Sequence, residues 1–133
     1  MNPRHALVAV RAGHRCEYCH APEVIFNFPF EVEHIVPPGR AGSDTEQNWA
    51  LACRSCNLHK SDGLEGTDPD TGATARLLHP RHDKWDEHFA VEIESGVIVG
   101  RTPIGRATIA RLRMNSTTQA HARLQWTRLG LFP

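Results

Sequence analysis

Two pairs of cysteines, each spaced as Cys-x2-Cys, constrain this sequence more than any other feature. Cys16 and Cys19 form one pair, Cys53 and Cys56 form the other, and the chain has no further cysteine. One tetrahedral Zn²⁺ suits two such pairs, because each short loop presents two thiolates at about 2.3 Å from the metal. A redox motif would need no second copy, and disulfides are disfavoured in a chain without a signal peptide. The spacing therefore predicts a zinc site.

The predicted zinc would be structural. Four thiolates leave the ion no open coordination position, so we expect it to hold the fold together rather than to act as a catalyst. It would join the ends of the segment 16–56 and so compensate for the small core of a short chain.

Length and charge set the broad class of protein. A chain of 133 residues is predicted to form a single domain, 1–133. With no apolar run near the ~20 residues of a membrane span, we expect a soluble, cytoplasmic protein with no membrane partner. The 15 basic and 15 acidic residues balance, but from Arg101 to the end there are six arginines and no acidic residue. That segment suits a local phosphate-binding face.

The segment between the cysteine pairs predicts a strand, a loop, a second strand and a helix. Residues 31–38 (EVEHIVPP) resemble a strand that ends at a double proline, since proline cannot continue a strand ladder. Residues 39–44 form the loop, 48–52 the second strand, and 53–62 a knuckle that runs into a short helix. This ββα unit gathers a carboxylate, two histidines and two asparagines beside the zinc site, a combination typical of a reactive centre.

The order of these motifs resembles the zinc-containing HNH endonucleases of the ββα-metal type. The resemblance rests on C-x2-C, E-H-I-x-P, a Gly-x-x-Gly loop, N-x-A-L-A-C and C-N-x2-K, and it covers roughly Arg15 to Asp62. The segments after residue 62 are similar to the tail of a group of small bacterial HNH proteins. The resemblance implies an HNH core at residues 14–62 and a C-terminal extension at 63–133.

The resemblance also implies a role for each matching residue. His34 would be the general base that takes a proton from the attacking water, and Asn48 would tie the loop and position the strand that carries His34. Glu33 and His59 would bind the catalytic divalent metal. Asn57, which directly follows Cys56, competes with His59 for the third position, and Glu31 competes with Glu33.

The chemistry of these residue types agrees with phosphodiester hydrolysis. Histidine supplies a base that titrates near neutral pH. A carboxylate and an imidazole leave most of the coordination sphere to water and phosphate, which suits Mg²⁺ or Mn²⁺, while the imidazole also admits Ni²⁺ or Zn²⁺. We therefore expect a metal-dependent HNH endonuclease acting on DNA, with RNA as an alternative substrate. The rival hypothesis is a catalytically inactive zinc-knuckle module that binds nucleic acid.

The C-terminal extension is predicted to contain a hairpin and two helices. Residues 63–84 resemble a mostly irregular connection, 89–94 and 97–99 a β-hairpin, and the helices run from Pro103 to about Met114 and from about Thr118 to Leu129. The expected fold class is α+β. Four cations are candidates for contacts with nucleic-acid phosphates: Arg40, Lys60, Arg106 and Arg113.

Overall fold

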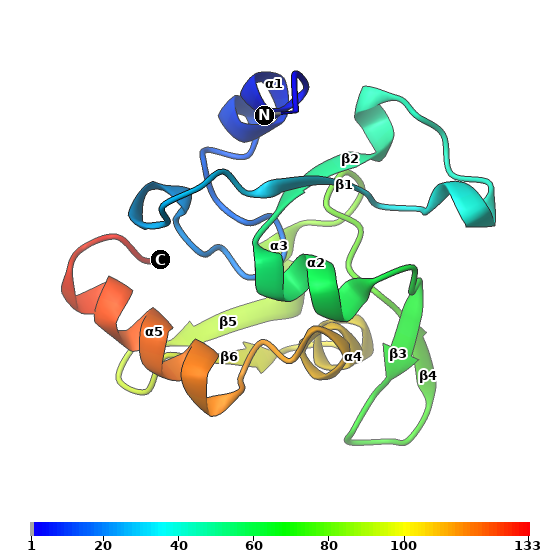
Figure 1. Cartoon of the computed structure of the whole chain (residues 1–133). Coiled ribbons are helices and arrows are strands. Elements are labelled where there is room, and N and C mark those ends of the chain that lie inside the picture. Colours follow the sequence, from blue (N-terminus) through cyan, green and yellow to red (C-terminus); the bar gives the residue numbers. More distant parts are fainter. Residues whose placement is uncertain (1) are drawn as a thin grey trace. The chain divides into compact units, whose positions relative to one another are not determined.

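A computed structural model describes residues 2–133. These residues form two compact units, one ending at Gly63 and the other running from Leu64 to Pro133. Each is a small mixture of helices and short antiparallel hairpins, in agreement with the predicted α+β class (Figure 1). The division into two compact units does not test whether the chain forms a single domain, so the single domain 1–133 remains a prediction. Within residues 2–133, no helix has both the length and the apolar character needed to cross a bilayer.

The first unit is built around one hairpin. Strand β1 (Glu31–His34) pairs antiparallel with β2 (Trp49–Ala52), with Glu33 opposite Ala50 and His34 opposite Trp49. Helices α1 (His5–Arg11) and α2 (Arg54–Lys60) both pack on the hairpin, on opposite sides of it in Figure 1. The short 3-10 turns η1 (Glu23–Ile25), η2 (Pro38–Arg40) and η3 (Glu46–Asn48) complete the unit. The predicted strand–loop–strand–helix order is confirmed.

The loop between the two strands folds back tightly onto the end of β1. Gly42 lies so close to Val36 that a Cβ at this position would collide with the Val36 carbonyl group. Glycine is required by this close approach of two backbone segments. The compact loop holds the residues after β1 in a defined position next to His34.

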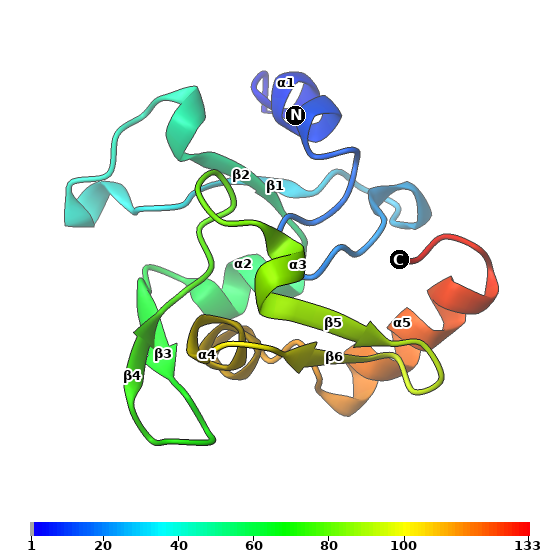
Figure 2. The same ribbon diagram turned by 180° about the vertical axis from the view of Figure 1, so that it is seen from behind.

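The second unit is organised around helix α4 (Pro103–Leu112). This helix packs against the hairpin of β3 (Glu65–Thr67) and β4 (Thr74–Arg76) and against β6 (Val97–Gly100). Strand β6 pairs with β5 (Phe89–Glu92), which follows the short helix α3 (Trp85–His88). Helix α5 (Thr117–Arg128) packs on β6. Figure 2 shows the β5–β6 hairpin with α5 beside it.

The predicted hairpin and both predicted helices of this unit are present, with ends that differ by a few residues. Helix α4 begins as expected, because the Thr102 hydroxyl accepts a hydrogen bond from the Gly105 N–H at 3.0 Å. It ends at Leu112, earlier than predicted, because Arg113 adopts a left-handed backbone conformation with φ of 53°.

Residues 63–84 were expected to be mostly irregular, and that expectation is wrong for β3 and β4. These strands are short and lack an alternating apolar pattern, so their sequence does not predict β-strands. They are held by packing on α4, where Gly66 brings β3 close to the backbone of Ala107. Tertiary contact, which local sequence does not encode, stabilises this hairpin.

Candidate functional site

The four cysteines come together at one point in the first unit. All four Sγ atoms lie within 4.8 Å of one another, and each side chain is buried. Cys53 is the N-cap of α2, where its sulfur accepts a hydrogen bond from the Cys56 N–H at 3.4 Å. The Cys19 N–H makes the matching contact with the Cys16 sulfur at 3.5 Å. Both knuckles therefore direct their sulfurs to a common centre.

The geometry of this centre fits a metal ion. Four sulfurs at 2.3 Å from a tetrahedral zinc ion would be about 3.8 Å apart, and the Sγ atoms of Cys19 and Cys53 are 3.7 Å apart. The N–H groups that point at sulfur would also stabilise thiolates. The predicted four-cysteine site is confirmed as a cluster positioned to bind a metal such as zinc.

A shallow, open pocket of about 370 Å³ lies at the end of β1 in the same unit. Its lining comes from β1, from the double proline after it, and from α2 and the residues that follow α2: Val32, Glu33, His34, Pro37, Pro38, Asn57, Ser61 and Asp62. The pocket therefore brings together the predicted base, a predicted metal-ligating carboxylate and the asparagine that competed with His59.

Glu33 is held firmly on the inner side of the strand. It is only 7% exposed, its Oε1 accepts a hydrogen bond from the Tyr18 hydroxyl, and its Oε2 lies 3.0 Å from the Lys60 ammonium nitrogen. Burial raises the pKa of Glu33, and the nearby Lys60 charge opposes that rise. Burial and the Glu33 charge together raise the pKa of Tyr18 well above its usual value, so its hydroxyl remains a donor. One accepted bond at each oxygen leaves further lone pairs on this carboxylate.

His34 is partly exposed and makes one side-chain hydrogen bond. Its Nε2 lies 2.9 Å from Asp44 Oδ1, across the loop that follows η2. Among residues 2–133, Nδ1 of this imidazole has no hydrogen-bond partner. One ring nitrogen is thus held by a carboxylate, while the other can accept a proton.

Asn48 fastens the loop to the strand with three hydrogen bonds. Its Oδ1 accepts from the Val36 N–H at 2.8 Å, and its Nδ2 donates to the carbonyls of Val36 at 2.8 Å and Ser43 at 2.7 Å. The side chain is buried, so each of these bonds replaces lost hydration. These bonds join the loop to the residue two positions after the end of β1.

His59 does not line the pocket. Its Nδ1 lies 2.8 Å from the carbonyl of Ser55, one turn earlier on α2. Asn57 does line the pocket, is partly exposed, and its side-chain amide has no hydrogen-bond partner among residues 2–133. Glu31 is exposed at the start of β1 and lines a different pocket. Of these four residues, only Asn57 and Glu33 line the pocket at the end of β1.

The four predicted phosphate contacts fall into two groups. Arg40 and Arg113 are exposed. Lys60 is 1% exposed, and its ammonium group donates to Glu33 and to the backbone carbonyls of His34 and Ile35, so its burial opposes the predicted contact with phosphate. Arg106 donates to both carboxylate oxygens of Asp68, each at 2.9 Å.

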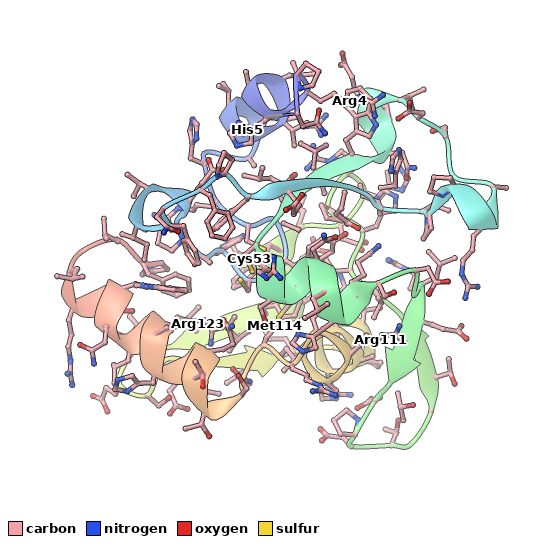
Figure 3. All side chains as sticks on the ribbon, viewed as in Figure 1. Arg4, His5, Cys53, Arg111, Met114 and Arg123 are labelled. Carbon is pink, nitrogen blue, oxygen red and sulfur yellow. The ribbon has the colours of Figure 1, made fainter. Side chains whose placement is uncertain are left out.

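The basic C-terminal segment is also less available than its sequence suggested. Arg123 is fully buried, and its guanidinium group donates to the carbonyls of Gly96 and Met114, each at 2.7 Å. Figure 3 shows this side chain in the interior of the second unit, close to Met114. The arginine is thus a structural link between α5 and the β5–β6 turn.

Two residues at the site were not given a role from the sequence. Asp44 lies in the glycine-rich loop, where an aspartate is usually a turn former, and only the folded loop places it against His34. Asp62 lines the pocket from the residues after α2. For Asn57 a signal was present, because it directly follows the last cysteine.

Comparison with known families identifies the same region. The model of the HNH endonuclease family matches residues 16–63, which include all four cysteines and the pocket residues. No curated protein and no solved structure matches the chain. Residues 16–63 are therefore similar to an HNH endonuclease domain and contain four cysteines positioned to bind a metal ion.

Proposed function

We propose that this chain is a metal-dependent HNH endonuclease that hydrolyses phosphodiester bonds of DNA, with His34 activating the attacking water. One observation carries the proposal: the pocket at the end of β1 is lined by His34, Glu33 and Asn57. A base and two oxygen ligands would then face one phosphate. The family match to residues 16–63 supports nucleic acid as the substrate class.

His34 would act as the general base. Imidazole is the side chain that exchanges a proton most readily near neutral pH. Its Nδ1 is the ring nitrogen without a partner among the described residues, and its side chain lines the pocket. A water in that pocket would transfer a proton to Nδ1 as its oxygen attacks phosphorus. Asn48 would keep the loop and the residues after β1 in fixed relative positions during this step.

Glu33 and Asn57 would hold the catalytic metal. A carboxylate and an amide carbonyl are hard oxygen ligands, and Mg²⁺ or Mn²⁺ is commonly bound by one or two such groups with water and phosphate completing the shell. When bound, the ion would stabilise negative charge on the phosphate and on the leaving oxygen. We place Asn57 here in preference to His59 because only Asn57 lines the pocket. The four cysteines would hold a structural zinc.

A second candidate function is a noncatalytic module that binds nucleic acid. One observation favours it: Glu33 is 7% exposed and already bonded to Tyr18 and Lys60, so a metal would compete with two established partners. In this case the pocket would be a remnant, and the exposed Arg40 and Arg113 would supply contacts with phosphates.

Nicking of supercoiled plasmid separates the two candidates. The chain and its His34→Ala variant are incubated with Mg²⁺, Mn²⁺, Ni²⁺ or Zn²⁺, and DNA binding is measured in parallel. His121→Ala is the matched control, because His121 is an exposed histidine on α5. We expect His34→Ala to abolish nicking and to keep binding, while His121→Ala keeps both. Nicking that survives in His34→Ala would overturn the base assignment, and binding without nicking in any metal would favour the noncatalytic module.

A further inference from the structure

Asp44, the last residue of the glycine-rich loop 39–44, is the centre of a hydrogen-bond cluster. Its Oδ1 accepts from His34 Nε2 at 2.9 Å and from the Trp49 indole N–H at 3.1 Å. The Arg4 guanidinium binds the same carboxylate with both terminal nitrogens, at 2.5 Å to Oδ1 and 2.7 Å to Oδ2. Three donors from three separate segments thus converge on one carboxylate.

The cluster holds Asp44 in place although its side chain is 59% exposed. Arg4, at the start of α1 (Figure 3), also lies over the Trp49 ring at 4.3 Å from the ring centroid. A two-pronged arginine contact fixes both the position and the plane of a carboxylate, which a single contact would not. These hydrogen bonds also hold the pKa of Asp44 well below its usual range, the Arg4 contact contributing most, so an ionised acceptor faces His34.

A carboxylate at Nε2 determines which nitrogen of a neutral imidazole carries the proton. The ionised carboxylate only accepts hydrogen bonds, so Nε2 must donate and Nδ1 is left with its lone pair. Nδ1 is the nitrogen that has no partner among residues 2–133. The contact with Asp44 therefore leaves Nδ1 of His34 as the nitrogen that can accept a proton, and it fixes the orientation of the ring.

We infer that Asp44 is a positioning residue for His34: it holds Nε2–H and so directs Nδ1 to receive the proton of the attacking water. The inference rests on the proposed function and adds a residue to it. In the step itself, an O–H bond of water breaks and its proton goes to Nδ1. The water oxygen forms a bond to phosphorus, and the bond to the leaving oxygen breaks with its electron pair on that oxygen. Nothing is oxidised or reduced.

The test uses Asp44→Asn in the full chain, with Asp86→Asn as the matched control. Asp86 is an exposed carboxylate on α3 with no histidine partner among the described residues. An amide at position 44 can donate to Nε2, which would favour the wrong tautomer of His34. We expect Asp44→Asn to lower kcat for plasmid nicking by on the order of a hundredfold with little change in KM. Asp86→Asn should leave both constants unchanged.

A second readout follows the tautomer directly. Long-range ¹H–¹⁵N NMR correlations distinguish Nε2–H from Nδ1–H in a neutral histidine, and loss of one set of signals in His34→Gln identifies His34. We expect Nε2–H in the unmodified chain and in Asp86→Asn, and a shift toward Nδ1–H in Asp44→Asn. A purely structural role for Asp44 would not move this signature. If Asp44→Asn loses its bound zinc, and hence its fold, Asp44→Ala replaces it in the kinetic measurement, and Asp44→Gln, which keeps an amide donor, replaces it in the tautomer measurement.

The outcomes separate this inference from the proposed function. If the unmodified chain nicks plasmid and Asp44→Asn matches it in kcat or in tautomer, the inference is overturned and the function stands. If the unmodified chain does not nick in any metal, the proposed function fails. The tautomer measurement then decides whether Asp44 orients His34, and an unchanged Nε2–H signal in Asp44→Asn overturns that too.

Discussion

Lys60 forms an ion pair with Glu33 in the interior of the first unit, with Nζ 3.0 Å from Oε2. The two side chains are 2% and 6% exposed. Lys60 also donates to the carbonyl of Ile35 at 2.9 Å, so one ammonium group joins α2 to the end of β1. An apparently phosphate-binding lysine is instead part of the support beneath His34.

Replacing Lys60 with methionine should lower the free energy of unfolding by about 3–5 kcal/mol, because the Glu33 charge would stay buried without its partner. Urea unfolding followed by circular dichroism measures the change. Lys84→Met is the control, because Lys84 is exposed, and a surface change of this kind stays within about 0.5 kcal/mol. Equal stability of the two variants would show that the buried pair contributes nothing.

Removal of zinc should unfold the segment 16–63. The metal supplies folding energy that a small core does not replace, and the four sulfurs that would bind it are buried together. We expect one zinc per chain by elemental analysis, and loss of both zinc and ordered structure in a strong chelator or in Cys16→Ser. A Cys16→Ser protein that is well folded and free of zinc would refute the structural site.

Asn57→Ala should reduce metal-dependent nicking by about a hundredfold or more, the scale of losing one stabilising contact to developing charge. His59→Ala is the matched control from the same helix, since His59 does not line the pocket. We expect it to keep most of the activity. The measurement is the nicking rate as a function of Mg²⁺ or Mn²⁺ concentration, and the reverse order of effects would return the ligand role to His59.

Arg106 and Arg113 were both candidates for phosphate contacts from the sequence, and the salt dependence of DNA binding should distinguish them. Arg113 is exposed, and Arg113→Gln should reduce the slope of log K against log salt by about 1, the loss of one phosphate contact. Arg106 is paired with Asp68 and Asp70, so Arg106→Gln should leave the slope unchanged. Fluorescence anisotropy at several salt concentrations gives the slopes. A change for Arg106 alone would reverse this assignment.

The second unit should lose stability in acid through Asp68. The Arg106 guanidinium lowers the pKa of Asp68 from 3.8 to about 2. A carboxyl whose pKa is lower in the folded state binds its proton more tightly when unfolded, so its stabilising effect is complete above about pH 4. That effect is lost as the pH falls toward 2. Urea unfolding at pH 2 to 6 should show a smaller loss in Asp68→Asn than in the unmodified chain, and parallel curves would contradict this assignment.

Local sequence was sufficient for features that depend on spacing and capping. The two Cys-x2-Cys pairs predicted the metal cluster because each knuckle directs two sulfurs to one point. The strand that ends shortly before the double proline and the cap at Thr102 also follow from short-range rules. The hairpin of β3 and β4 was missed because packing on α4, and not its own residue pattern, holds it.

Residue type alone did not decide which polar side chains serve the pocket. Strict alternation along β1 sends Glu33 inward to Lys60 and leaves His34 at the loop. The pocket nevertheless includes both, because it lies at the end of the strand. Which of Asn57 and His59 lines the pocket depends on the rotation of α2, since residues two apart on a helix point in different directions.

The sequence by itself determined that the chain has a four-cysteine site enclosing a ββα unit with a histidine at the end of its first strand. The tertiary structure decided the partners of the charged groups: Lys60 with Glu33, Arg106 with Asp68, and Arg4 and His34 with Asp44. Cysteine spacing is a short-range geometric constraint that local sequence carries. A charged side chain finds its partner only when the fold brings distant segments within a few ångströms and removes the competing water.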